Sequence, residues 1–278
     1  MFILAIETTG PYGSVALLDG DGNVLGYEVS RDTMSHLKDL IPMVDTVLKK
    51  SGVSKNEINL IAPSVGPGSF TGIRIGVSTA RALCQALRIR AVAVPTLEAF
   101  CFKESAPAAA RCQEAGGSVT SAACDGAAAC EAGDGGGSAA SAVCAIINAR
   151  RGQVYGMIDG FMKPGPYMLT DVLEVYKSKL EPCGRRMIFF GDGIDAYEKD
   201  IKEALGQPGP GYEFVPAKDR YQDAVSVGRW AAAHLRRHGI EDSTVDFENL
   251  LPDYMRRAEA EQKLESGQLP ICKGPRQE

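Results

Sequence analysis

The chain has 278 residues, of which 45% are hydrophobic, and a formal net charge of −5 at pH 7, and this length favours two lobes of about 100–150 residues each. Because acids outnumber Lys and Arg and no basic stripe is visible, the composition argues against unaided binding of nucleic acid. The apolar start has no basic segment and meets Glu7 early, so it predicts neither a signal peptide nor a membrane span, and we expect a cytoplasmic protein without membrane contacts.

The first residues predict a meander of three strands followed by an amphipathic helix. Short apolar runs separated by turn residues predict strands at Phe2–Ile6, Ser14–Leu18 and Val24–Val29. A helix is predicted from Ser35 to about Ser51, because apolar residues recur there at helical spacing. These residues are Leu37, Leu40, Ile41, Val44, Val47 and Leu48.

A glycine-rich segment at residues 65–76, V-G-P-G-S-F-T-G-I-R-I-G, is the most diagnostic part of the chain. It follows a strand predicted at Leu60–Val65 and opens a long helix that runs to about Leu87. Ser69 and Thr71 can cap the free N–H groups at the start of that helix, where an anion could also bind.

The long helix carries small residues at Gly72, Gly76 and Ala80, one every four positions. This spacing leaves one helix face nearly bare, so that another backbone can approach closely. Spacing alone gives equal weight to packing within the chain and packing against a partner.

Beyond a strand predicted at Ala91–Val94 lies a low-complexity insertion from Lys103 to Ala142, rich in Ala and Gly and without aromatic residues. Such a segment cannot bury enough apolar surface to offset its ordering entropy, so we expect a mobile loop. We expect lobes at 1–102 and 143–250, on either side of this insertion, and a tail at 251–278 whose end frays.

The pattern of the second half resembles that of the first, which predicts a duplicated α/β unit. Strands are predicted at Val143–Asn148, Val154–Asp159 and Met187–Phe190, with an edge strand at Tyr212–Val215. Helices are predicted from about Thr170, after Gly191-Asp192-Gly193, and at Asp223–Arg237.

Several segments together resemble the TsaB family, also called YeaZ, over nearly the whole chain outside the insertion. They are I-L-A-I-E-T-T, S-H-L-K-D-L-I-P-M-V-D, the glycine-rich segment, I-I-N-A-R-R-G-Q-V-Y, G-D-G at 191–193 and L-P-D-Y-M-R-R-A-E. The resemblance implies the two-lobed actin-like, sugar kinase and Hsp70 ATPase (ASKHA) α/β superfold, a duplicated ribonuclease H-like unit, with the tail packed back on the first lobe. It also implies a noncatalytic subunit of the bacterial machinery that makes threonylcarbamoyladenosine beside the tRNA anticodon.

The resemblance further implies a heterodimer with the catalytic paralogue TsaD, support of the ATPase TsaE, and contact with tRNA only through the complex. Docking is expected through an antiparallel helix pair that joins two matching helices of the partner, so a bulky residue at Gly76 would disrupt it. A bare face is also compatible with a homodimer of the free chain. The expected interface residues are Leu37, Leu40, Ile41, Val44, Gly72, Arg74, Gly76 and Ala80.

No catalytic residue and no metal site are predicted in this chain. TsaD carries a metal-binding H-x-x-x-H after a Val-Pro region, where this sequence has Thr96 and Phe100, and neither supplies an imidazole. His234 and His238 are four residues apart, but no Glu between them can act as a general base, so we interpret them as residues of a helix end.

In active members of the superfold, a turn after the first strand cradles nucleotide phosphates. Glu7, Thr8 and Thr9 occupy those places here, but the second phosphate turn is the bulky Arg150-Arg151 pair. We therefore expect no cofactor on this chain by itself, and ATP or ADP at the interface of the complex. The residues expected near that nucleotide are Glu7, Thr8, Thr9, Arg150, Arg151, Gly191 and Asp192. The alternative is a self-sufficient ATP-dependent transferase or kinase-like enzyme, with Asp192 as its carboxylate.

Overall fold

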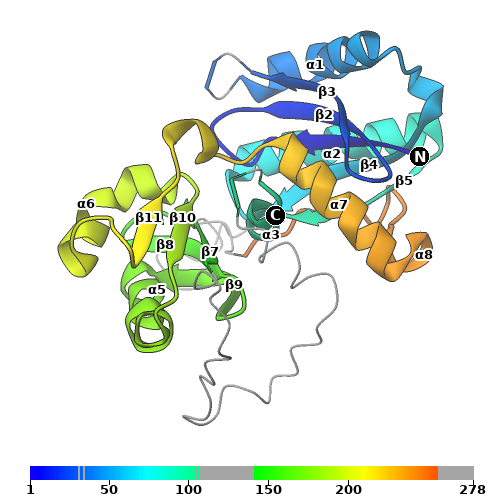
Figure 1. Ribbon diagram of the computed structural model, residues 1–278. Helices are drawn as coiled ribbons and strands as arrows, with labels where there is room; N and C mark the ends of the chain where they lie inside the picture. Colours follow the sequence, from blue (N-terminus) through cyan, green and yellow to red (C-terminus); the bar gives the residue numbers. More distant parts are fainter. Residues whose placement is uncertain (31, 34, 104, 107–140, 256–278) are drawn as a thin grey trace, which may run out of the picture.

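The protein forms two lobes, each built on one β-sheet (Figure 1). The computed structural model describes residues 1–30, 32–33, 35–103, 105–106 and 141–255. Most of the insertion predicted at 103–142 and most of the tail at 251–278 lie outside the described residues. The two-lobed α/β architecture predicted from the sequence is confirmed.

The first lobe holds a six-stranded sheet, counted over the described residues. Its strands are β1 (Phe2–Glu7), β2 (Ser14–Asp19), β3 (Val24–Val29), β4 (Ile58–Gly66), β5 (Arg90–Ala91) and β6 (Val94–Pro95). They lie in the order β3-β2-β1-β4-β5, with β6 paired to β4, and β1, β2 and β3 form the predicted antiparallel meander. Ile3 and Ala5 point to one face of the sheet and Leu4 and Ile6 to the other, and all four are fully buried, so helices cover both faces.

The second lobe repeats this plan with five strands among the described residues. They are β7 (Ala142–Asn148), β8 (Gln153–Ile158), β9 (Met162–Met168), β10 (Met187–Phe190) and β11 (Tyr212–Phe214). Their order, β9-β8-β7-β10-β11, and their directions match those of the first sheet, so the predicted duplication is confirmed. Strand β9 was not predicted from the sequence, because Pro164 and Pro166 are typical of a loop. β9 is an edge strand, where proline is tolerated.

Helices fill the space between and around the sheets. The longer ones are α1 (His36–Ser51), α2 (Phe70–Leu87), α5 (Leu169–Val175), α6 (Gly193–Leu205) and α7 (Ala224–His238), and the short ones are α3 (Thr96–Ala99), α8 (Ile240–Ser243), η1 (Lys55–Glu57), η2 (Phe100–Phe102), η3 (Tyr176–Leu180), η4 (Glu181–Cys183) and η5 (Ala217–Asp219). Side chains cap two of the predicted helix starts: the Ser69 hydroxyl accepts from the Gly72 N–H at 3.3 Å, and the Asp223 carboxylate accepts from the Ser226 N–H at 2.7 Å.

Helix α7 packs on the first sheet, although its position in the sequence placed it in the second lobe at 143–250 (Figure 1). It contacts β1 and β2, and Gly228 lies so close to Leu18 that a Cβ at residue 228 would overlap the leucine side chain. The Ser14 hydroxyl accepts from the Ala224 N–H at 2.9 Å. Helical periodicity predicts an apolar face correctly, but it does not say which sheet that face covers.

Helices α1 and α2 begin at the same end of the first sheet, against the turn at 8–13. The Ser69 N–H donates to the Thr9 carbonyl at 2.8 Å, and the His36 ring lies 3.0 Å from the Gly10 carbonyl oxygen. Each helix joins strands that run in one direction, from β3 to β4 and from β4 to β5. The two helices therefore run in the same direction, which corrects the antiparallel pair expected from the sequence.

The small-residue face of α2 packs inside this chain. A Cβ at Gly72 would overlap the backbone carbonyl oxygen of Thr8, and a Cβ at Gly76 would overlap the Thr8 hydroxyl. That hydroxyl donates to the Gly72 carbonyl at 2.7 Å. Ala80 is fully buried in the core of the same lobe. The expectation that these three residues contact a partner is therefore wrong. The bare face of α2 accommodates the backbone of the turn at 8–13, between β1 and β2, which we call the first turn.

Replacing Gly72 with alanine is expected to destabilise the free protein, because the methyl group would overlap a backbone atom that cannot move independently. We expect a loss of about 3 kcal/mol in the free energy of unfolding, measured by urea denaturation, at the upper end for overpacked sites. Ser78→Ala, on the exposed side of the same helix, is the control and should change that free energy by less than about 0.5 kcal/mol. Equal stability of the two variants would contradict this packing.

Candidate functional site at the start of α1 and α2

Two apolar side chains of α1 are exposed to solvent. Leu37 is 80% exposed and Ile41 is 54% exposed, whereas Leu40 and Val44 are buried in the core of the first lobe. Residues four apart share a helix face, so 37 and 41 form the outer stripe and 40 and 44 the inner one. The expectation that all four residues contact a partner is therefore wrong for Leu40 and Val44.

The first turns of α2 present an aromatic ring and a cation that lie together on the surface. The Arg74 guanidinium carbon is 3.9 Å from the centroid of the Phe70 ring, and the Arg74 Nε–H donates to the Tyr254 hydroxyl at 2.9 Å. The Phe70 and Tyr254 rings are 4.8 Å apart. An exposed cation–π contact of this kind contributes about 0.5–1 kcal/mol, enough to restrict a long arginine side chain to one region.

Tyr254 reaches this place because the closing segment returns to the first lobe. The Asp253 N–H donates to the Val65 carbonyl at 2.8 Å, and Leu250 is fully buried in the core beside α1 and α2. Gly66, with φ of 131°, lies directly beneath, and any Cβ there would overlap the Asp253 carbonyl oxygen. The glycine-rich segment thus places both the helix start and the tail.

We call the surface formed by Leu37, Ile41, Phe70, Arg74 and Tyr254 the docking face. Its α1 and α2 residues lie at the same end of the sheet, because both helices begin at the turn at 8–13. Leu37, Ile41 and Arg74 were predicted as interface residues from the sequence, but Phe70 and Tyr254 were not. Phe70 directly follows the capping serine and lies outside the four-residue spacing of the glycines, and only the fold brings Tyr254 next to it.

The side chains at the start of the turn between β1 and β2 point into the interior of the protein. Glu7, Thr8 and Thr9 are at most 2% exposed, and the Glu7 carboxylate accepts from both the backbone N–H and the hydroxyl of Thr9, the latter at 2.6 Å. Burial raises the pKa of Glu7, an effect that hydrogen bonds from Ser64 and Thr9 partly offset. These three side chains cannot touch a nucleotide unless the turn rearranges, which corrects the expectation for them.

The corresponding loop of the second lobe remains at the surface. Arg150 and Arg151 are exposed and have positive φ angles of 65° and 55°, a region that side chains other than glycine rarely adopt. Asp192 anchors the start of this loop by accepting from the Asn148 N–H at 3.1 Å, and burial raises the pKa of Asp192 to about 6. Gly191 packs against the Ile146 backbone, where a Cβ would overlap the carbonyl oxygen.

Residues 220–222, which link the second lobe to α7, separate the predicted nucleotide-proximal residues of the first lobe from those of the second. Arg220 and Tyr221 both bond to the Asp195 carboxylate of α6, and the Tyr221 ring lies 5.5 Å from Tyr12 in the first turn. The neighbouring Gln222 side chain packs directly on Gly10. Residues 220–222 therefore lie between Glu7 and Asp192, and the structure does not bring together the carboxylates that the kinase-like alternative requires.

The positions aligned with the paralogue's histidines belong to the core. Phe100 is 1% exposed and its ring lies 6.1 Å from that of Phe190, while the Thr96 hydroxyl is 3.2 Å from that of Ser64. Among the described residues, no group of three or more His, Cys, Asp or Glu side chains could hold a metal ion. Within the same residues, no helix combines the length and apolar character needed to cross a membrane.

The chain is similar to several proteins that are named for tRNA modification. A family model described as "TsaD: tRNA N6-adenosine threonylcarbamoyltransferase" matches residues 29–115. The "tRNA threonylcarbamoyladenosine biosynthesis protein TsaB" of Bacillus subtilis (strain 168) is 28% identical over 95% of this chain and 97% of that protein. The protein of the same name from Escherichia coli (strain K12) is 40% identical, over 35% of this chain and 41% of that protein.

Solved structures show the same fold over nearly the full chain. "YeaZ from Pseudomonas aeruginosa" superposes with a TM-score of 0.59 at 24% identity, covering 91% of this chain and 99% of that one. A second structure, of a protein from that organism described as similar to peptidase YEAZ, gives a TM-score of 0.61 at 22% identity, over 92% and 99% of the two chains. The fold class expected from the sequence is thus confirmed.

Stability should depend on pH through Asp192. Burial raises its pKa to about 6 in the folded protein, whereas the unfolded chain loses this proton near pH 4. The free energy of unfolding therefore falls as the pH rises from about 4 to 6, and it stays lower above pH 6. Asp192→Asn keeps an oxygen acceptor for the Asn148 N–H. It should raise the free energy of unfolding by about 1–2 kcal/mol at pH 7.5 and give no gain near pH 3.5.

Urea denaturation at the two pH values measures this difference. Asp200→Asn is the control, because Asp200 is exposed on the same helix, α6, and bonds to no other described residue. An equal gain from both variants, or a gain for Asp192→Asn that does not depend on pH, would contradict the burial of this carboxylate.

Proposed function

Because the chain belongs to the TsaB (YeaZ) family, whose members are named for tRNA threonylcarbamoyladenosine biosynthesis, we propose that it is the noncatalytic scaffold subunit of the bacterial transferase complex. In this role it binds the catalytic paralogue TsaD as a heterodimer and, with it, supports the ATPase TsaE. tRNA is reached through the complex. The observation that carries the proposal is the exposed docking face at the start of α1 and α2.

The extent of the TsaD family model supports the choice of partner. Its match, residues 29–115, includes all of α1 and α2, so TsaD has a stretch that corresponds to this helix pair. Two related chains that present corresponding surfaces can pair about an approximate two-fold axis, in which each helix pair faces the other. The same geometry would allow a homodimer when TsaD is absent.

The composition of the docking face is suited to protein association. Leu37 and Ile41 expose apolar surface that costs free energy in water, and Arg74, restricted by Phe70 and Tyr254, offers a cation in a fixed place. Arginine and aromatic side chains contribute disproportionately to protein interfaces when they are desolvated. We therefore expect Ile41 and Arg74 near the centre of the contact.

The noncatalytic assignment rests on two places where this chain lacks the side chains that catalysis would need, the metal site and the phosphate turn. Thr96 and Phe100 fill the core where the paralogue's metal-binding histidines are expected, and neither can coordinate iron or zinc. Glu7, Thr8 and Thr9 hold the first turn against α2 and do not fit a nucleotide as phosphate ligands. We infer no turnover by the free chain.

A nucleotide at the interface of the complex would be reached from Arg150 and Arg151. Both residues are exposed, and backbone strain at a non-glycine residue in this region is typically retained where the side chain has a function. Their guanidinium groups suit a phosphate, which arginine binds through paired hydrogen bonds. We propose this contact for ATP or ADP held mainly by the partner.

Ile41→Asp should weaken binding to TsaD from the same organism at least tenfold, because it places a charge in an apolar contact. Titration calorimetry and light scattering of the mixture measure the effect. Ile240→Asp is the matched control, since Ile240 is 51% exposed on α8, away from the docking face. The proposal is contradicted if both variants bind TsaD as the parent does.

Arg150→Gly should leave the free energy of unfolding within about 1 kcal/mol of the parent, because glycine adopts positive φ without strain. The same change should lower threonylcarbamoyladenosine formation by the reconstituted complex, with an increased KM for ATP. Full activity of this variant at limiting ATP would show that the loop does not touch the nucleotide.

A further inference from the structure

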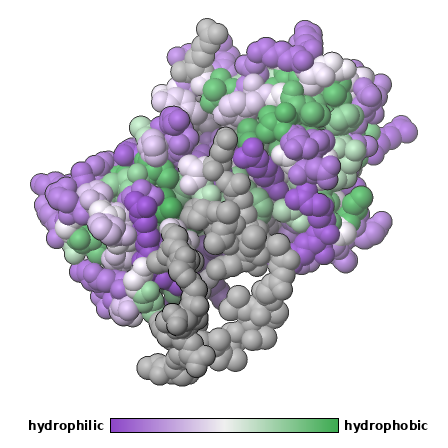
Figure 2. Space-filling view, in the orientation of Figure 1, coloured by the Kyte–Doolittle hydropathy of each residue, from purple (hydrophilic) through white to green (hydrophobic). Residues whose placement is uncertain are grey.

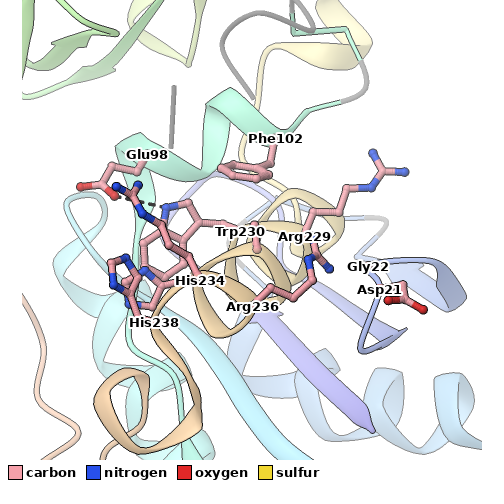
Figure 3. Close-up of a pocket in the computed structure, with 11 residues that line it drawn as sticks. Asp21, Gly22, Glu98, Phe102, Arg229, Trp230, His234, Arg236 and His238 are labelled. Carbon is pink, nitrogen blue, oxygen red and sulfur yellow. Dashed lines mark hydrogen bonds between the residues drawn. The ribbon is translucent and has the colours of Figure 1, made fainter. Parts of the chain in front are cut away.

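A cavity of about 770 Å³ lies on the side of the first lobe opposite α1 and α2 (Figure 3). It is lined by α7, by Glu98 and Phe102 from the segment that leads out of the first lobe, and by Asp21 and Gly22 in the turn between β2 and β3. Its volume falls within the range of about 300–1,000 Å³ that is usual for small-molecule sites. The proposed function uses none of these residues.

One wall of the cavity is a row of three rings along α7, which we call the ring ladder. The Trp230 and His234 rings are stacked, 4.5 Å apart at 12°, and the His234 and His238 rings are 4.6 Å apart and tilted by 43°. Burial lowers the pKa of His234, which favours the neutral imidazole. His238 is exposed, so the ladder ends on a ring that a further flat group can reach.

The rest of the lining is rich in arginine, in a chain whose net charge is negative. Arg229, Arg236 and Arg237 face only two acids, Asp21 and Glu98, among the lining residues, and Figure 2 shows hydrophilic surface along α7. Arg236 and Arg237 occupy the last helical turn, where cations ordinarily complement the helix dipole. That explanation does not cover Arg229, which lies about two turns before Arg236 and makes no hydrogen bond or ion pair with the described residues.

Glu98 supplies a hydrogen-bond acceptor at the aromatic end of the cavity. One of its carboxylate oxygens accepts from the Trp230 indole N–H at 3.2 Å, which fixes the side chain beside the ring ladder (Figure 3). A carboxylate has further lone pairs for the amino or imino hydrogens of a nucleobase edge. Arg229 and His234 are five residues apart, about 7.5 Å along the helix axis and about 140° around it. They line the cavity from opposite sides of α7 (Figure 3), so a base with its ribose and phosphate would lie across the helix to reach both.

We propose that this cavity binds a nucleotide unit, with the base against Glu98 and the histidine end of the ring ladder and the phosphate at Arg229 and Arg236. Stacking on aromatic rings and arginine contacts to phosphate are the two interactions by which proteins commonly hold single nucleotides of a strand. The same unit is presented by a free mononucleotide and by unpaired RNA. A site for one nucleotide needs only a few cations. It is therefore compatible with the lack of a basic stripe in the sequence, which argues against unaided binding of a longer nucleic acid.

The sole tryptophan of the chain, Trp230, gives a direct test. Its fluorescence is followed in the isolated protein during titration with AMP, with a short single-stranded oligoribonucleotide and with inorganic phosphate. We expect saturable quenching by a nucleotide ligand and at least tenfold weaker binding in Arg229→Gln. Arg81→Gln, on α2 at the opposite face of the sheet, is the matched control and should bind as the parent does.

The outcomes separate the sources of the ligand. Quenching by AMP that depends on Arg229 supports a free nucleotide, and quenching only by the oligoribonucleotide, with the same dependence, supports an RNA strand. Equal affinity for AMP and inorganic phosphate, binding unchanged in Arg229→Gln, or no saturable change up to about 1 mM ligand overturns the proposal. Because the protein is titrated alone, the result does not depend on association with TsaD.

Discussion

The contact between the α2 glycines and the first turn is the constraint on which the rest of the structure depends. Gly72 and Gly76 leave no room for a Cβ against Thr8, and Thr8 returns a hydrogen bond to the Gly72 carbonyl. This contact sets how deeply α2 sits in the lobe, and the adjoining turn residues Thr9 and Gly10 contact the starts of both helices. The surface that α1 and α2 expose follows from that placement.

The same contact explains why the residues expected near a nucleotide, Glu7, Thr8 and Thr9, are buried in this chain. Thr8 and Thr9 hold the start of α2, and Gln222 packs on the other side of the turn. Side chains bonded in this way stabilise the first lobe. What remains accessible is the proposed docking face, together with a loop of two exposed arginines in the second lobe.

The sequence predicted most of the strands and helices because each has a clear period and clear caps, as Ser69 and Asp223 illustrate. The sequence did not show which surface each helix face packs against. The four-residue spacing of Gly72, Gly76 and Ala80 fits packing on a partner as well as packing on Thr8, and only the tertiary structure distinguishes the two. Similarly, α7 has the apolar periodicity of a core helix, yet β1 and β2, the strands that it contacts, lie more than 200 positions earlier in the chain. Tyr254 could not be assigned to the candidate site from the sequence either, because Arg74, which it contacts, is distant in the chain.

Hydrogen–deuterium exchange on the protein, free and mixed with TsaD from the same organism, tests directly whether TsaD binds the docking face. We expect binding to slow exchange in peptides covering the first turns of α1 and α2 and the segment around Tyr254, with little change in β3 or α7. Protection confined to β3, to α7 or to the second lobe would show that TsaD binds elsewhere, and the docking face would then have to be abandoned.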